Sequence, residues 1–220
     1  MELCSALSEG GLTPTLGLLE AALGACELEV VALVRARRGD FVYDDDERGV
    51  HLRDAQRLVA GGVHGLAVGA LLPSGELDLS HLRALIGAAG SAKLTCHRAF
   101  DHCSDPFLAL EQLIELGFAR VLTSGQAPTA PEGQALLAQL VERADGRIEI
   151  LAGGGVRPSN VAELVRATGV PAVHSSAARD EPSPMQRRPA ISMGGDAKSD
   201  EFVRRVTDEL MVRSCRRALT

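Results

Sequence analysis

The feature that most constrains the fold of this chain is a pattern that repeats from residue 27 onward. Each repeat has a short run of Leu and β-branched residues, a polar loop, an amphipathic helix and a glycine before the next run. Consecutive runs are far enough apart for one crossover helix and two loops, the connection that parallel strands require. The strand-like runs begin near Leu28, Leu66, Lys93, Arg120, Ile148 and Pro171. The pattern predicts an α/β protein with a parallel sheet.

Three of the intervening helices carry start and stop signals. At the start, a side-chain oxygen accepts a hydrogen bond from an unpaired backbone N–H, and proline suits the first helical position. At the end, glycine adopts the left-handed conformation that closes a helix. The predicted helices run from Thr13-Pro14 to near Gly24, from Asp105-Pro106 to Gly117 and from Pro158 to Gly169.

An open doubly wound sheet and a closed barrel both fit this repetition. Glycines and polar residues follow nearly every strand instead of one switch point, which favours a (β/α)8 TIM-type barrel. Counting residues 1–4 as a strand gives seven strands, whereas this barrel closes with eight. We therefore expect one domain over residues 1–220 that lacks its first βα unit, a true start upstream of Met1, and aggregation through the unpaired edges.

The last part of the chain breaks the pattern. Prolines and glycines follow Arg179 without helical periodicity, which predicts a long loop over the barrel mouth at about residues 179–198. A closing helix is predicted at about residues 199–219.

Composition limits the class of protein. Apolar residues make up 45% and charged residues 24%, as in ordinary soluble proteins. The net charge of −6 and the lack of a basic run interleaved with aromatics argue against a nucleic-acid partner. No apolar stretch is long enough to span a membrane, and the five cysteines form no C-x-x-C pair. We expect a cytoplasmic protein with reduced thiols that can form a homodimer, because barrels often pair.

Polar residues directly after the strands are the candidate site, because the carboxyl ends of barrel strands meet at one rim. They are Arg35; His97, Arg98 and Asp101; Thr123, Ser124 and Gly125; Gly153, Gly154 and Gly155; and His174, Ser175 and Ser176.

His97, Arg98 and Asp101 place an imidazole, a guanidinium and a carboxylate within five residues. These groups can move a proton and hold an anion, which makes them the candidate catalytic residues. An equally good interpretation is a structural ion pair between Arg98 and Asp101 with His97 packed beneath it.

The segment Gly153-Gly154-Gly155 runs from a strand toward a helix, so its backbone N–H groups could approach an anion at the positive helix start. Ser175 and Ser176 would add hydroxyls from the neighbouring strand, and Arg35, Thr123, Ser124, Gly125 and His174 would complete the anion site. The alternative is that the glycines only relieve a tight turn.

Metal binding has weaker signals. Cys96-His97 and His102-Cys103 resemble ligand pairs, but successive strand residues point to opposite faces, which argues against zinc. Two thiolates can satisfy Cu(I), so the scattered Cys4, Cys26 and Cys96 leave a Cu(I) ion possible. The acidic residues 44–47 lack the spacing of a calcium loop and fit a helix start.

Seven ordered motifs together resemble the CutC family. They are residues 2–5 (ELCS), 9–14 (EGGLTP), 37–41 (RRGDF), 97–101 (HRAFD), 121–125 (VLTSG), 153–155 (GGG) and 174–177 (HSSA). The resemblance implies a barrel, a role in copper homeostasis and Cys4 as a Cu(I) ligand.

The chain departs from that family at two places. The family has a strand and a helix before the position of Met1, and that strand carries the second proposed copper-binding cysteine. Its Arg-Pro-Arg-Gly-Gly-Asp-Phe stretch has Ala36 and Arg38 here in place of Pro and Gly. Two hypotheses follow: a copper-homeostasis protein that binds Cu(I), and a barrel enzyme acting on a small phosphorylated or carboxylated metabolite.

Overall fold

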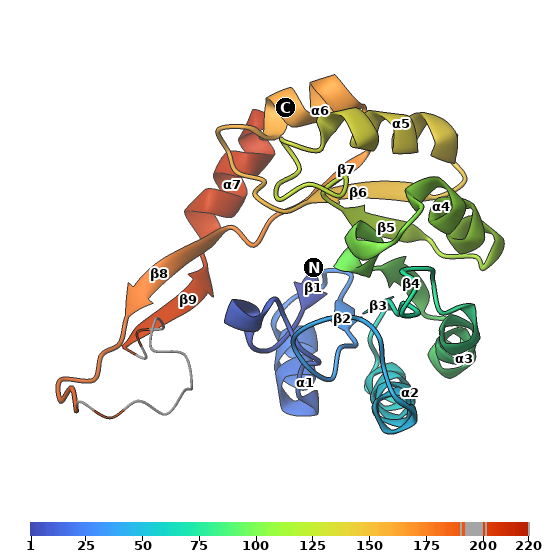
Figure 1. Cartoon of the computed structure of the whole chain (residues 1–220). Coiled ribbons are helices and arrows are strands. Elements are labelled where there is room, and N and C mark those ends of the chain that lie inside the picture. The colour runs from blue at the N-terminus through green and yellow to red at the C-terminus, as the bar shows by residue number, and fades with distance from the viewer. Residues whose placement is uncertain (190, 192–199, 201, 220) are drawn as a thin grey trace.

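The structure is a computed structural model that describes residues 1–189, 191, 200 and 202–219. Seven parallel strands form one sheet whose spatial order follows the chain order, from β1 to β7. The strands are β1 (Glu2–Leu3), β2 (Val31–Leu33), β3 (Gly65–Val68), β4 (Lys93–Cys96), β5 (Arg120–Thr123), β6 (Glu149–Gly153) and β7 (Ala172–His174). β1 and β7 are the two edges, and the sheet curls into an open half-barrel (Figure 1). The sequential order excludes the doubly wound alternative.

Helices connect the strands and cover the outside of the sheet (Figure 1). They are η1 (Leu7–Glu9), α1 (Leu16–Ala25), α2 (Asp45–Ala60), α3 (Leu79–Ala89), η2 (Arg98–His102), α4 (Pro106–Glu115), α5 (Gln134–Ala144) and α6 (Val161–Thr168). Asp105 accepts hydrogen bonds from the backbone of Phe107 and Leu108, as its position before Pro106 predicts. The cap of α1 is Thr15, two residues after the predicted Thr13.

The main hydrophobic core lies between the sheet and the helices. Helices α1, α3, α4, α5 and α6 each contribute at least one leucine with no measurable exposure, among them Leu82, Leu110 and Leu140. The amino-terminal end of the strands carries charged side chains instead, where Glu29 pairs with Lys93 and Arg120. The opposite, carboxyl-terminal end of the half-barrel is therefore the place to look for a site.

The carboxyl-terminal part differs from the prediction. β8 (Ala178–Pro182) and β9 (Val203–Thr207) form an antiparallel hairpin that projects from the half-barrel, with α7 (Glu209–Ala218) after it (Figure 1). The predicted loop thus begins with a strand, and its residues 190 and 192–198 lie outside the described part of the chain. The helix predicted from about residue 199 begins at Glu209, because Asp208 supplies its cap.

Among the described residues, no helix is long and apolar enough to cross a membrane.

Candidate functional site

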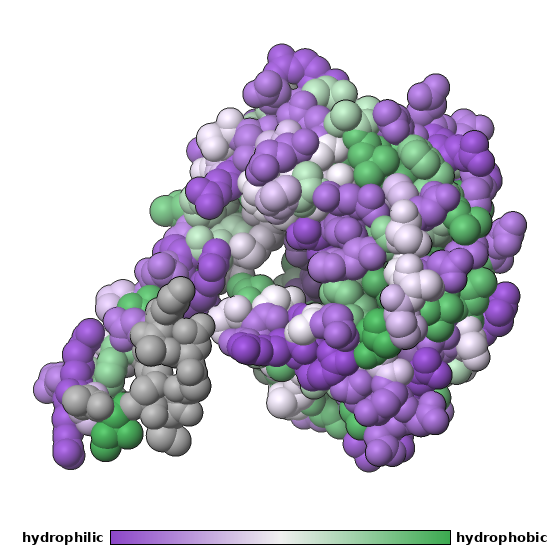
Figure 2. Space-filling view, in the orientation of Figure 1, coloured by the Kyte–Doolittle hydropathy of each residue, from purple (hydrophilic) through white to green (hydrophobic). Residues whose placement is uncertain are grey.

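A cavity of about 390 Å³ lies at the carboxyl ends of the strands. Strands β1, β2, β5 and β7 and the segments after β2, β4 and β6 all contribute to its wall. The space-filling view shows this face hollowed near its centre, beside the projecting hairpin (Figure 2). Of the residues predicted from sequence, Cys4, Arg35, His97, Arg98, Gly154 and His174 line the cavity. The other predicted residues lie outside its wall: Asp101, Thr123, Ser124, Gly125, Gly153, Gly155, Ser175 and Ser176.

His97 is buried, and its protonation state follows from its contacts. Its Nδ1 accepts a hydrogen bond from the backbone N–H of Ala99 at 3.1 Å, so Nδ1 carries no proton. Burial, and then the nearby charge of Arg35, lower the pKa of His97 to about 3. The ring is therefore neutral at physiological pH, with its proton on Nε2. This buried Nε2–H has no hydrogen-bond partner within the described structure.

Arg35 is a buried cation held by carbonyl groups. Its guanidinium donates to the carbonyl oxygens of Glu9 and Gly11 at 3.1 Å each and of Gly39 at 2.9 Å. The guanidinium carbon also lies 5.2 Å from the centre of the Phe41 ring. No carboxylate of the described residues forms an ion pair with it. Its positive charge is thus solvated by dipoles and is not neutralised.

Arg98 and Asp101 form an ion pair, as the structural interpretation of this motif requires. Asp101 also accepts hydrogen bonds from the Thr123 hydroxyl and from the backbone N–H groups of Ser124 and Gln126. This set of donors occupies the carboxylate and anchors the loop after β5 to η2. Arg98 itself remains 39% exposed and donates to the Ser124 hydroxyl at 2.9 Å, so its guanidinium reaches the cavity wall.

The local structure favours glycine at each of the three positions at the end of β6, for a different reason at each. A Cβ at Gly153 would lie 2.5 Å from Leu122 Cδ1, and one at Gly154 would lie 2.8 Å from Arg98 Nη1. Gly154 and Gly155 adopt φ values of 97° and 71°, which favour glycine. The Ser175 hydroxyl is engaged with the Val156 carbonyl at 2.8 Å. These contacts account for the glycines without an anion, and only Gly154 lines the cavity.

Glu2, which is not among the site residues predicted from the sequence, lines the same cavity. Glu2 and Cys4 are two residues apart on and just after β1, so both point to the interior of the half-barrel. Burial raises the pKa of Glu2, while His174 opposes this. Burial, and then the charge of Glu2, also raise the pKa of the Cys4 thiol. The alternation of side chains between the two faces of β1 is the sequence signal that could have indicated Glu2 as a site residue, because it places Glu2 on the same face as Cys4.

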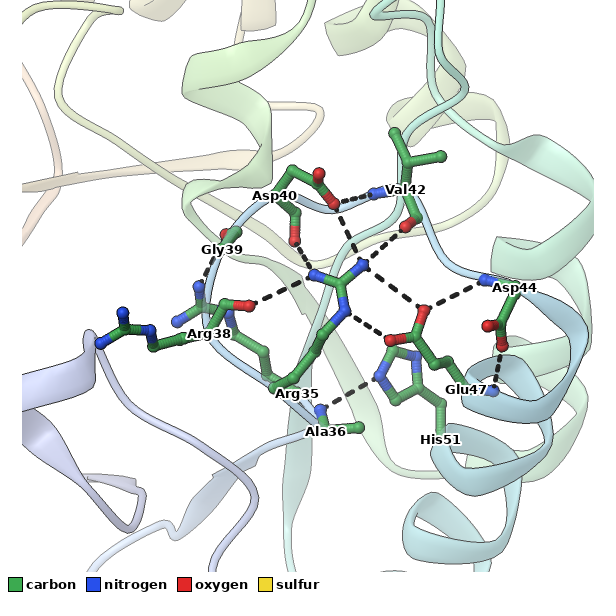
Figure 3. Close-up of polar contacts among 10 residues, drawn as sticks. Arg35, Ala36, Arg38, Gly39, Asp40, Val42, Asp44, Glu47 and His51 are labelled. Carbon is green, nitrogen blue, oxygen red and sulfur yellow. Dashed lines mark hydrogen bonds and ion pairs between the residues drawn. The ribbon is translucent and has the colours of Figure 1, made fainter. Parts of the chain in front are cut away.

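The loop between β2 and α2 carries Arg35 and Phe41, and hydrogen bonds and ion pairs of Arg37 hold this loop together. Arg37 pairs with Glu47 and Asp40 and donates to the Val42 carbonyl at 2.8 Å. The Ala36 N–H donates to His51 Nε2 at 3.2 Å, a hydrogen bond that a proline at this position could not make (Figure 3).

Within the described ranges, no group of three or more His, Cys, Asp or Glu side chains is placed to hold a metal ion. Cys4 is the one predicted metal ligand that lines the cavity.

Comparison with known proteins decides the family. The model of the CutC family matches residues 1–179. The chain belongs to the CutC family. A CutC family protein of Vibrio vulnificus is 43% identical over 97% of this chain and 86% of its own length, and one of Porphyromonas gingivalis is 44% identical over the same shares.

The fold comparison agrees with that assignment. The solved structure of a CutC protein from Streptococcus agalactiae is 34% identical to this chain and has a TM-score of 0.76. The match covers 79% of this chain and 86% of the other. The name of that protein connects it with copper homeostasis.

Proposed function

We propose that the cavity at the carboxyl ends of the strands binds a small anionic metabolite, phosphorylated or carboxylated. The observation that carries this proposal is His97, which lines the cavity together with Arg35 and Arg98 and whose buried Nε2–H has no partner among the described residues. Leaving a buried donor unpaired costs about 1–3 kcal/mol, so an acceptor atom in the cavity is favoured.

The charges of the wall favour an anion as that acceptor. Arg35 has no carboxylate partner among the described side chains, and Arg98 shares its charge with Asp101 only. A carboxylate or phosphate can accept several N–H groups at once, and such charge-assisted hydrogen bonds are about twice as strong as neutral ones. Two acidic side chains, Glu2 and Glu9, also line the wall, and Glu9 is paired with Arg38.

The test is a thermal-shift screen of phosphorylated and carboxylated metabolites. We expect a ligand to raise the melting temperature of the native protein, and to lose at least about tenfold in affinity with Arg98→Met, because removing a charged hydrogen bond costs about 1.5–3 kcal/mol. Arg143→Met is the matched control, since Arg143 lies on α5 and pairs with Glu111 away from the cavity.

Each variant is compared with its own ligand-free melting temperature, which separates loss of binding from loss of stability. Anions that stabilise the native protein and Arg98→Met equally would show that they bind elsewhere, and a screen in which no anion binds would remove the proposal.

Binding of Cu(I) through Cys4 is the second candidate, because Cys4 is a half-buried thiol in the wall of the same cavity and thiolate is the soft ligand that Cu(I) selects. The fit is incomplete. The raised pKa of Cys4 means that Cu(I) must displace a proton, which weakens binding at neutral pH.

This candidate predicts Cu(I) binding that depends on Cys4 and tightens as the pH rises. A titration of Cu(I) against a competing chelator measures it, with Cys4→Ser as the test and Cys26→Ser, at the end of α1, as the control. Equal affinity of the native protein and Cys4→Ser would remove Cys4 as a ligand.

A further inference from the structure

Glu2 and His97 face one cavity from different strands of the half-barrel. Glu2 lies on β1 and His97 directly follows β4, and both line the cavity. The Glu2 carboxylate forms no hydrogen bond or ion pair with another described residue, in contrast to Glu9, which pairs with Arg38, and Asp101, which accepts four donors. The cavity therefore combines an unpaired carboxyl group with a neutral N–H donor.

The direction of the His97 hydrogen bond restricts its chemistry. Because Nδ1 is occupied by the Ala99 N–H, His97 presents only Nε2–H and cannot accept a proton there. A neutral imidazole N–H is suited to an oxygen atom on which negative charge develops, such as a carbonyl oxygen becoming an enolate. The nearby Arg35 adds a fixed positive charge to the same wall.

We infer that the cavity catalyses proton transfer at a carbon next to a carbonyl group of its anionic ligand, with Glu2 as the base and His97 as the donor to the carbonyl oxygen. The inference rests on the proposed anion site and adds a reaction class to it. Arg98 would hold the carboxylate or phosphate of the substrate.

The step balances without a cofactor. The Glu2 carboxylate takes the proton from carbon, the electron pair of the C–H bond forms a C=C bond, and the carbonyl π electrons move to oxygen. His97 Nε2–H and Arg35 stabilise the resulting enolate. Return of a proton from Glu2 to the same carbon, with the electrons of the C–O bond again forming the carbonyl, completes the exchange.

Neighbouring groups are poorer bases. The Cys4 thiol is held protonated by its surroundings, and the Asp101 carboxylate is occupied by its donors and lies outside the wall. Glu9 is engaged with Arg38.

The experiment follows exchange of carbon-bound hydrogen in D2O by proton NMR. The probes are 2-oxobutyrate, oxaloacetate, dihydroxyacetone phosphate and ribulose 5-phosphate, with binding of each measured in parallel by thermal shift. The full chain is used in its native form and as Glu2→Gln, which removes the base and keeps the shape. Glu115→Gln, on the exposed side of α4, is the matched control.

We expect the native protein and Glu115→Gln to accelerate exchange of at least one probe that binds. Glu2→Gln should bind that probe but exchange its hydrogen about a hundredfold more slowly, the scale of a general base. His97→Gln, which keeps an N–H donor, should retain more exchange than His97→Leu.

Two groups of results would overturn the inference. A bound probe whose hydrogens do not exchange, or which exchanges equally fast with Glu2→Gln, refutes proton transfer and leaves the anion site standing. Binding of other anions, but of none of the four carbonyl probes, would also refute proton transfer and leave the anion site standing. Failure of every anion to bind would refute the proposed function together with the inference.

Discussion

The buried histidines show how single residues of this chain fix their own protonation. His51 Nε2 accepts a hydrogen bond from the Ala36 N–H, so the proton of the neutral His51 ring is on Nδ1. This Nδ1–H donates to His81 Nε2, which lies 3.2 Å away. Burial lowers the pKa of His51 to about 4, and it also lowers the pKa of His81. Together with His97, three histidines are thus folded in the neutral form.

These histidines predict a loss of stability in mild acid. In the unfolded chain each has a pKa of about 6.5, so between that value and the lower folded values the unfolded state binds more protons. Their contribution is fully present above about pH 6.5 and is lost as the pH falls toward about 4 for His51 and about 3 for His97. Each histidine contributes up to about 1.4 kcal/mol per pH unit.

Urea unfolding between about pH 7.5 and about pH 5 measures this slope. His51→Gln, whose side-chain oxygen can still accept the Ala36 N–H, should make the free energy of unfolding less dependent on pH. His102→Gln, at an exposed histidine, is the matched control. A slope for His51→Gln equal to that of the native protein would contradict the assignment.

At the scale of elements, local signals predicted the repeating part of the fold well. Strands begin within about three residues of their predicted positions, for example β4 at Lys93 and β5 at Arg120. A helix cap such as Asp105 depends only on hydrogen bonds to the next few residues, so it can be recognised from the local sequence. Pairing of β8 with β9 depends on residues far apart in the chain, and the prolines of the connecting stretch concealed it.

The sequence also predicted part of the site, namely the residues whose place depends only on their position at the end of a strand. Arg35, His97, Arg98 and His174 follow or end strands, and parallel strands bring such residues to one rim. Asp101 follows the same rule, but its hydrogen bonds to the loop after β5 take it out of the wall, and only tertiary structure shows them. Sequence order alone also cannot show that the Ser175 hydroxyl is used by a backbone carbonyl.

Across the whole molecule, the half-barrel pairs its charged side chains differently at its two ends. At the amino-terminal end of the strands, Arg120 is matched by Glu29 and Glu149. At the cavity end Arg35 has no such partner within the described side chains, and the Glu2 carboxyl group in the same wall is also without an ion pair. A guanidinium without an ion pair attracts a ligand group of opposite charge.

An anionic ligand that completes this cavity should be visible in a crystal structure of the protein grown with the tightest-binding anion from the screen. The predicted result is an oxygen atom of the ligand within hydrogen-bond distance of His97 Nε2, with its negative group against Arg98. A ligand bound outside the cavity, or a cavity that holds only water at saturating ligand, would contradict the account.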